Sequence, residues 1–318
     1  MQNDQIEMVS IGQLLPLGHN YRKLKELIDF TKVAKGAKFS DSGVGAIGFG
    51  KTRLISCLIL QFMEDVSDRE FERFIGENIA AKWFCGFNIC EKTPDFTTIS
   101  KFRSLLGTQN IAKLFKEVKK QLQAKGHCAE IFTFVDATAL VSKLSLWTER
   151  DKAITAGYEK LNNEVLPKVS SDNEVRIGAK SKNKFWTGYK KHVAVDMKSG
   201  MITKVAVTKA NVSDADGAKH VLPRSGAVCA DKGYIGAINE MKRRDVHPMV
   251  ILKNNMKEKN KDKDRFLSSL RAPYEGVFSK QNKRVRYKGV VKNQAAEFLY
   301  AIAFNLRRLL SINSTCSA

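Results

Sequence analysis

"IFTFVD" at residues 131–136 and "GAVCAD" at residues 226–231 are two short apolar runs, and each of them ends in an aspartate. Short apolar runs bounded by turn residues are typical of buried β-strands. Functional groups of α/β sheets gather where strands end, so we expect Asp136 and Asp231 to lie close together. One strand-end aspartate is often only a cap or turn residue, and the pattern gains weight because there are two.

The segments around these two runs alternate between strand-like and helical patterns. The sequence predicts a hairpin over 186–209, helices over 213–222 and 236–245, a strand over 247–253 and an apolar helix over 293–310. The resulting order of strand, hairpin, helix, strand, helix, strand and helix is typical of a mixed β-sheet with helices packed on it.

The first part of the chain has a different pattern. Apolar residues recur at helical spacing in 21–34, 52–63 and 67–78, and a short basic helix is predicted within 93–107. This arrangement is similar to a helix-turn-helix, although an all-helical packing domain with a solvated basic face fits it equally well. We therefore predict a helical DNA-binding domain over 1–125 and a mixed α/β domain over 126–318.

The charge of the protein restricts the classes of partner. Its 54 Lys and Arg against 33 Asp and Glu give a net charge of +21 in 318 residues, which indicates a polyanion and most simply a nucleic acid. A membrane surface is the competing polyanion. No apolar run approaches the roughly 20 residues that a membrane span requires, and the N-terminus lacks a signal-peptide pattern, so a cytoplasmic protein is expected.

The six cysteines do not indicate a metal centre. No pair of them forms a C-x-x-C motif with a matching His or Cys pair downstream, as a structural zinc site would need. We expect reduced thiols and no zinc.

A third acidic residue stands out near the C-terminus. Glu275 is the single carboxylate within 271–292, a stretch rich in Lys and Arg. It could complete a divalent-metal site with Asp136 and Asp231, with basic neighbours holding phosphates. Alternatively, it could be a surface glutamate that pairs with Arg271 one helical turn earlier, which would contribute little.

Several motifs together carry a family resemblance that runs over nearly the whole chain. These are "FVDATAL", "KFWTGYKKHVAVDMKSGMI", "ADKGYIG", "RAPYEGVF", "RVRYKGVVKN" and "AIAFNLRRL", preceded by the helical segment that ends in "TPDFTTISKFR". In this order and spacing they resemble the DDE transposases of bacterial insertion sequences, specifically insertion sequence family five. The resemblance implies an RNase H-like fold and assigns the catalytic acids to Asp136, Asp231 and Glu275.

The resemblance also implies a chemistry and a set of partners. The three acids would bind Mg²⁺ or Mn²⁺, water would attack a phosphodiester at the end of the element, and the freed 3'-OH would attack target DNA. The expected partner is double-stranded DNA, both as terminal inverted repeats and as target. A homodimer is expected because two ends must be brought together, and a bacterial protein of this kind would be associated with the nucleoid.

Basic residues near the predicted site and in the basic N-terminal helix are expected to contact DNA phosphates. They are Lys101, Arg103, Lys190, Arg271, Lys280, Lys283, Arg284, Arg286 and Lys288. The chain departs from the family pattern at two positions, with Ser268 where Tyr is usual and Asn282 where Lys is usual.

Two other functions compete with this interpretation. "GAIGFGKT" at 45–52 matches the phosphate-loop pattern of ATPases, but a phosphate loop follows a buried strand and the preceding "GAKFSDSGV" leaves no room for one. We therefore expect a connector that leads into a helix near Lys51. A non-catalytic DNA-binding protein or a decayed transposase copy would explain the charge but not the three placed acids.

Overall fold

The computed structural model describes residues 9–37, 48–142, 146–181, 183–257, 259–279 and 283–315. The chain divides into two compact units, one formed by 1–121 together with 302–318 and the other by 122–301. The predicted domain boundary near residue 125 stays a prediction. Each unit is described by itself below.

The first unit is helical, as predicted. Its helices are α1 (Asn20–Leu27), α2 (Phe30–Gly36), α3 (Lys51–Glu64), α4 (Asp68–Glu77), α5 (Ile79–Cys85) and most of α6 (Phe96–Ala124). α4 begins with a capping box: the Ser67 side chain accepts from the Glu70 backbone N–H, and the Glu70 carboxylate accepts from the Ser67 N–H. α6 is interrupted at Gly107, whose φ of 67° is not helical.

The second unit is built on a six-stranded mixed sheet. Its strands are β1 (Phe132–Val141), β2 (Arg176–Ser181), β3 (Lys184–Asp196), β4 (Ile202–Lys209), β5 (Gly226–Ala230) and β6 (Val246–Val250). The strand order is β2-β3-β1-β5-β6, with β4 paired to β3. β1 is antiparallel to β3 and parallel to β5, which confirms the predicted mixed sheet.

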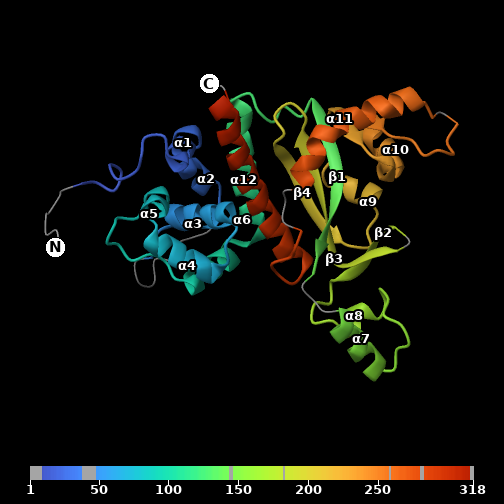
Figure 1. The fold of residues 1–318 in the computed structure, drawn as a ribbon, viewed down its shortest axis with the longest axis horizontal. Coiled ribbons are helices and arrows are strands. Elements are labelled where there is room, and N and C mark those ends of the chain that lie inside the picture. Colours follow the sequence, from blue (N-terminus) through green and yellow to red (C-terminus); the bar gives the residue numbers. More distant parts are fainter. Residues whose placement is uncertain are drawn as a thin grey trace, which may run out of the picture. The chain divides into compact units, whose positions relative to one another are not determined.

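One strand and one helical segment lie outside the sequence prediction. β2 carries a single β-branched residue, Ile177, so it has no strand pattern of its own and forms by pairing with β3. The stretch between β1 and β2 holds α7 (Leu146–Thr155) and the short α8 (Leu166–Val169), which lie beyond one end of the strands (Figure 1).

Helices pack on both faces of the sheet because successive residues of a strand point to opposite sides. Val135 and Ala194 share a core with α9 (Asp214–Ala218), η1 (Lys232–Ala237) and α10 (Ile238–Arg243). Phe134 and Asp136 belong to the opposite face, where α11 (Lys261–Ser279) packs against β1 and β5. The last helix is α12 (Val290–Thr315). Among the helices described, none is long and apolar enough to cross a membrane.

Candidate active site

The two predicted aspartates lie at the same level of the sheet, but only Asp231 ends its strand, because β1 continues past Asp136 to Val141. Phe134 of β1 is opposite Cys229 of the parallel strand β5, so two residues further along each chain bring Asp136 level with Asp231. Asp136 is still inside β1, opposite Val193 of β3, whereas Asp231 directly follows β5. The parallel pairing is therefore what brings two carboxylates 95 positions apart in the sequence to one edge of the second unit.

Asp231 is held in place by the turn that follows β5. Its Oδ1 accepts a hydrogen bond of 2.8 Å from the backbone N–H of Gly233, so it caps η1. A Cβ at Gly233 would lie 3.0 Å from Asp231 Oδ1 and 3.1 Å from Asp214 Oδ2. Two carboxylates thus converge on the bare α-carbon of Gly233, and a larger residue there would push them apart.

The electrostatics of Asp136 show that the site carries an excess of negative charge. The pKa of Asp136 is raised to about 6, mainly by burial and also by the charges of Asp231 and Asp214, while the Ala137 N–H and Arg271 oppose the rise. Ionising Asp136 beside two other carboxylates is costly, and a bound divalent cation would offset the repulsion among the three negative charges. The chemistry of this donor set fits a hard cation such as Mg²⁺.

Asp214 is a member of this acidic group that sequence reasoning missed. It lies in the first turn of α9, and the segment "SDADG" was interpreted only as the capped start of a helix. Its Oδ1 accepts from the Lys190 ammonium at 2.8 Å, and the same ammonium donates to the carbonyl of Val212 at 2.7 Å. The only available signal was an aspartate at the start of a helix that directly follows the predicted hairpin.

A tyrosine hydroxyl is buried next to the three carboxylates. Tyr234 is fully buried in the core under α9 and α10, and its hydroxyl has no hydrogen-bond partner among the residues that the structure describes. Burial raises the pKa of Tyr234 well above its usual value, and Asp136, Asp214 and Asp231 add to the shift. The hydroxyl therefore stays protonated, and it is a donor that the acidic site can use.

The third predicted acid, Glu275, lies in α11 one turn after Arg271, and its side chain is outside what the structure describes. α11 packs against the face of β1 to which Phe134 and Asp136 belong. The Arg271 guanidinium lies 5.5 Å from the centre of the Phe134 ring, and the Tyr274 ring lies 6.1 Å from it. The Tyr274 hydroxyl also donates to the Met197 carbonyl. Within the described ranges no three His, Cys, Asp or Glu residues form a metal-binding group. The Glu275 side chain is outside those ranges, and its convergence on the two aspartates therefore stays a prediction.

Comparison with known families decides what this arrangement belongs to. Residues 132–306 match the family model described as "Transposase DDE domain", and residues 9–105 match the one described as "Transposase domain (DUF772)". The chain belongs to the transposase DDE domain family. It is an enzyme of DNA transposition, which acts by DNA cleavage and strand transfer. A search of solved structures found no match.

Membership of the family agrees with the fold. A helical N-terminal region followed by a mixed sheet with flanking helices is consistent with the RNase H-like DDE fold, which confirms the predicted fold class. DDE transposases generally use divalent metal ions, in keeping with the excess negative charge around Asp136.

Several basic residues expected to bind DNA have partners within the transposase itself. Arg103 forms a bidentate pair with Asp68, at 2.8 Å and 2.6 Å. Lys190 is bound to Asp214, as described above, and only 12% of its side chain is exposed. The guanidinium of Arg286 lies 5.3 Å from the centre of the Tyr300 ring. Their predicted DNA contacts stay predictions, and each would have to coexist with the contact already made.

The other predicted DNA-binding residues differ in exposure. Lys101, Lys283, Arg284 and Lys288 are exposed, and Lys280 lies outside the described residues. The Lys283 carbonyl accepts from the Val141 N–H at 2.7 Å, so this basic segment adjoins the end of β1.

The phosphate-loop motif of the transposase is described only from Gly48 onward, and 45–47 lie outside the described part of the chain. α3 begins at Lys51, as expected, after Gly50 with a φ of 81°. The Lys51 ammonium donates to the Ala37 carbonyl. A phosphate-loop lysine would instead be available to a nucleotide, so this contact gives the ATPase interpretation no support.

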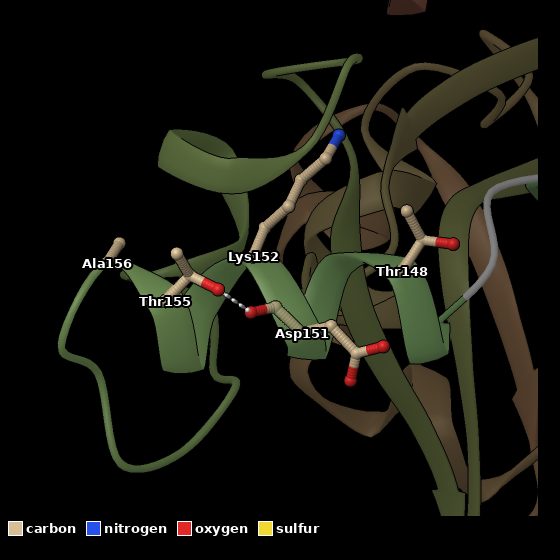
Figure 2. Close-up of a pocket in the computed structure, with 5 residues that line it drawn as sticks. All are labelled: Thr148, Asp151, Lys152, Thr155 and Ala156. Carbon is tan, nitrogen blue, oxygen red and sulfur yellow. Dashed lines mark hydrogen bonds between the residues drawn. The ribbon is translucent and has the colours of Figure 1, made fainter.

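A shallow hollow of about 450 Å³ occurs on α7 and the residue that follows it. Figure 2 shows its lining residues, Thr148, Asp151, Lys152, Thr155 and Ala156, with the Thr155 hydroxyl bound to the Asp151 carbonyl. None of the predicted site residues lines it.

Proposed function

We propose that Asp136, Asp231 and Glu275 are the catalytic acids of this transposase and that they bind Mg²⁺, or Mn²⁺ in its place. The observation that carries the proposal is the parallel register of β1 and β5, which brings Asp136 level with Asp231 on the sheet, with Asp136 on the face that α11 covers. The charge of Asp231 also contributes to the raised pKa of Asp136. Bound divalent cations supply activation of the attacking oxygen and stabilisation of the leaving 3'-oxygen.

The residues of the chain have separate tasks in this proposal. Asp136 and Asp231 hold their carboxylates at one edge of the sheet, and Glu275 approaches from α11. Arg271, one turn before Glu275, supplies a positive charge beside Asp136 and can hold a DNA phosphate near the acids. The Tyr234 hydroxyl, protonated and buried, can donate to an oxygen in the site.

We also propose that the DNA substrates are the terminal inverted repeats of an element of insertion sequence family five. The net charge of +21 supports binding to DNA in general, and the helical first unit is the candidate reader of the repeats. A homodimer would synapse the two ends, because one active site has to act at each end.

Metal-dependent nicking of a duplex that carries the element's ends tests the proposal. Asp136→Asn, Asp231→Asn and Glu275→Gln should each lower cleavage by at least about a thousandfold and leave DNA binding intact, because each removes one ligand charge. The matched control is Asp262→Asn, an aspartate in the first turn of α11 whose side chain is 91% exposed. Wild-type cleavage in any of the three variants would overturn the assignment of that acid.

Assembly is tested separately by light scattering during size-exclusion chromatography. We expect two protein chains in the complex with two DNA ends. A stable complex of one chain with one end, active in strand transfer, would contradict the proposed dimer.

A further inference from the structure

The tip of the β2–β3 hairpin, residues 179–181 and 183–185, combines exposed positive charge with an exposed aromatic ring. Lys180 and Lys184 are exposed, and the Phe185 side chain is 62% exposed. No acidic residue occurs between Val175 and Lys191, whereas this stretch holds six Lys or Arg. Lysines without acidic neighbours attract a polyanion, and an exposed ring between them can contact apolar surface on the same partner.

The stem below this tip is rigid. Trp186 lies across Gly178, so closely that a Cβ at Gly178 would be 2.5 Å from the indole Cζ2. The indole N–H of Trp186 donates to the Tyr189 carbonyl at 3.0 Å. Phe185 pairs with Ala179 across the hairpin, next to a register shift between Ala179 and Ser181. These contacts fix the stem that carries the tip, and a pre-formed stem lowers the entropic cost of binding.

The hairpin reaches beyond the rest of the sheet. The ladder between β1 and β3 ends at Gly188, so the residues of β3 before it pair with β2. Val193 is opposite Asp136, and Phe185 is eight residues before Val193 on the same strand. At about 3.3 Å per residue the tip lies about 26 Å from the acidic site along β3. That distance corresponds to roughly 8 base pairs of duplex DNA.

We propose that the tip of the β2–β3 hairpin binds double-stranded DNA about 8 base pairs from the cleaved phosphate. Lys180 and Lys184 contact backbone phosphates, and Phe185 packs against sugars or base edges in a groove, into which a two-stranded β-ribbon fits. The distance rests on the proposed function, because it assumes that the cleaved phosphate lies at Asp136 and Asp231.

The first test measures duplex affinity by fluorescence anisotropy across salt concentrations. Lys180→Gln with Lys184→Gln should lower affinity by about eightfold per lysine near 0.1 M salt and reduce the slope of log K against log salt by about 1.8. Phe185→Ser should lower affinity about fivefold and leave the slope unchanged, because it removes apolar contact in the groove and no charge.

The matched control is Arg224→Gln with Lys242→Gln. Both residues are exposed and flank the N-terminal ends of β5 and β6, opposite the end that leads into Asp231. This pair removes the same charge as the lysine variant. An equal loss of affinity and slope in both double variants would mean that Lys180 and Lys184 act only through the overall positive charge of the protein, and it would overturn the proposal.

The second test locates the contact with a series of cleavable duplexes, shortened from either side of the scissile phosphate. The lysine variant should bind more weakly than wild type while the duplex extends beyond about 8 base pairs on one side. It should match wild type once that side is trimmed below this length. A defect that persists when both sides are trimmed would overturn the predicted position.

The outcomes separate this inference from the proposed catalytic assignment. Asp136→Asn should bind the full duplex normally and not cleave it, whereas the lysine variant should cleave a trimmed duplex at the wild-type rate. If the three acids prove dispensable but the hairpin variants lose duplex affinity, the catalytic assignment fails and the hairpin contact stands. If the hairpin variants bind DNA normally and change the oligomeric state instead, the tip contacts a second copy of the chain and the inference is wrong.

Discussion

Lys190 of β3 and Asp214 of α9 form an ion pair of 2.8 Å beside the catalytic candidates. Asp214 raises the pKa of Asp136, so its charge acts on the site. Lys190 is the counter-ion of Asp214. We therefore expect the two members of the pair to influence the pKa of Asp136 in opposite directions.

We predict that the two members of this pair shift the pH dependence of cleavage oppositely. Asp214→Asn removes a negative charge and lowers the pKa of Asp136, while Lys190→Met leaves Asp214 uncompensated and raises it, by up to about one unit each. The acidic limb of the pH–rate profile should move accordingly. Carboxyl titration of the metal-free protein by NMR provides a readout that is independent of activity. Shifts of the Asp136 pKa in the same direction in both variants would contradict the opposite effects predicted for Lys190 and Asp214.

The raised pKa of Asp136 also predicts a pH-dependent cost in stability. Its value is about 6 in the folded protein and about 3.9 in an unfolded chain, so the favourable contribution is complete below about pH 4 and is lost as the pH rises through 6. Without divalent metal, Asp136→Asn should be more stable than wild type by about 1–2 kcal/mol at pH 7.5 and by less at pH 5.

Urea unfolding at both pH values measures this difference, with Asp262→Asn as the control for loss of an exposed carboxylate. Added Mn²⁺ should stabilise the wild type at pH 7.5, since only the wild type keeps the Asp136 carboxylate as a metal ligand. The difference in unfolding free energy between Asp136→Asn and wild type should then become smaller or change sign. If the stability difference between wild type and Asp136→Asn is the same at both pH values, ionisation of Asp136 does not cost the folded protein stability.

The imidazole of His192 leaves no room for a side chain at residue 217. A Cβ on Gly217 would lie 2.0 Å from His192 Cε1, and His192 is completely buried, with its Nε2 2.9 Å from the Thr208 hydroxyl. We predict that Gly217→Ala destabilises the protein by about 3 kcal/mol, because neither the ring nor α9 can move away without repacking.

Thermal unfolding compares this variant with Gly76→Ala, for which the nearest atom is 4.0 Å from the new Cβ. Adding His192→Ala to Gly217→Ala should recover part of the loss in spite of the cavity it creates. If the double variant is less stable than the single one by the full cost of His192→Ala, the clash is not with His192.

A buried ion pair on the other face of the sheet gives a further prediction. Lys191 Nζ lies 2.9 Å from Glu297 Oε2, with 1% and 6% of the two side chains exposed. Burial raises the pKa of Glu297 and Lys191 opposes that rise. Lys191→Met should cost about 3–5 kcal/mol, because it leaves a buried carboxylate without its counter-charge.

Lys191→Met combined with Glu297→Leu should recover most of that loss, since two apolar side chains can fill the same space without a desolvation cost. Urea unfolding of the two single variants and the double variant gives the coupling. Additive losses would contradict the assigned role of the pair.

The amino-acid pattern alone was enough to predict the two apolar strands, the mixed sheet and the position of Asp231 directly after its strand. Each of these depends on local periodicity and on where a strand stops, and both can be read within a few residues. The helical first unit was predictable for the same reason. The expected end of the first strand at Asp136 was wrong, because pairing with β3 extends β1 to Val141. The family resemblance then named the third acid, and its meeting with the other two stays a prediction.

Only the tertiary structure decided which distant side chains meet. Asp214 joins the acidic group and Lys190 is bound to it because the register of β3 and the position of α9 bring them together, and no local pattern encodes that contact. β2 likewise forms by pairing with β3, and the Trp186 ring packs against Gly178 in the stem of the hairpin. Burial and charge act between residues far apart in the chain, so the pKa of Asp136 could be known only after folding had placed its neighbours.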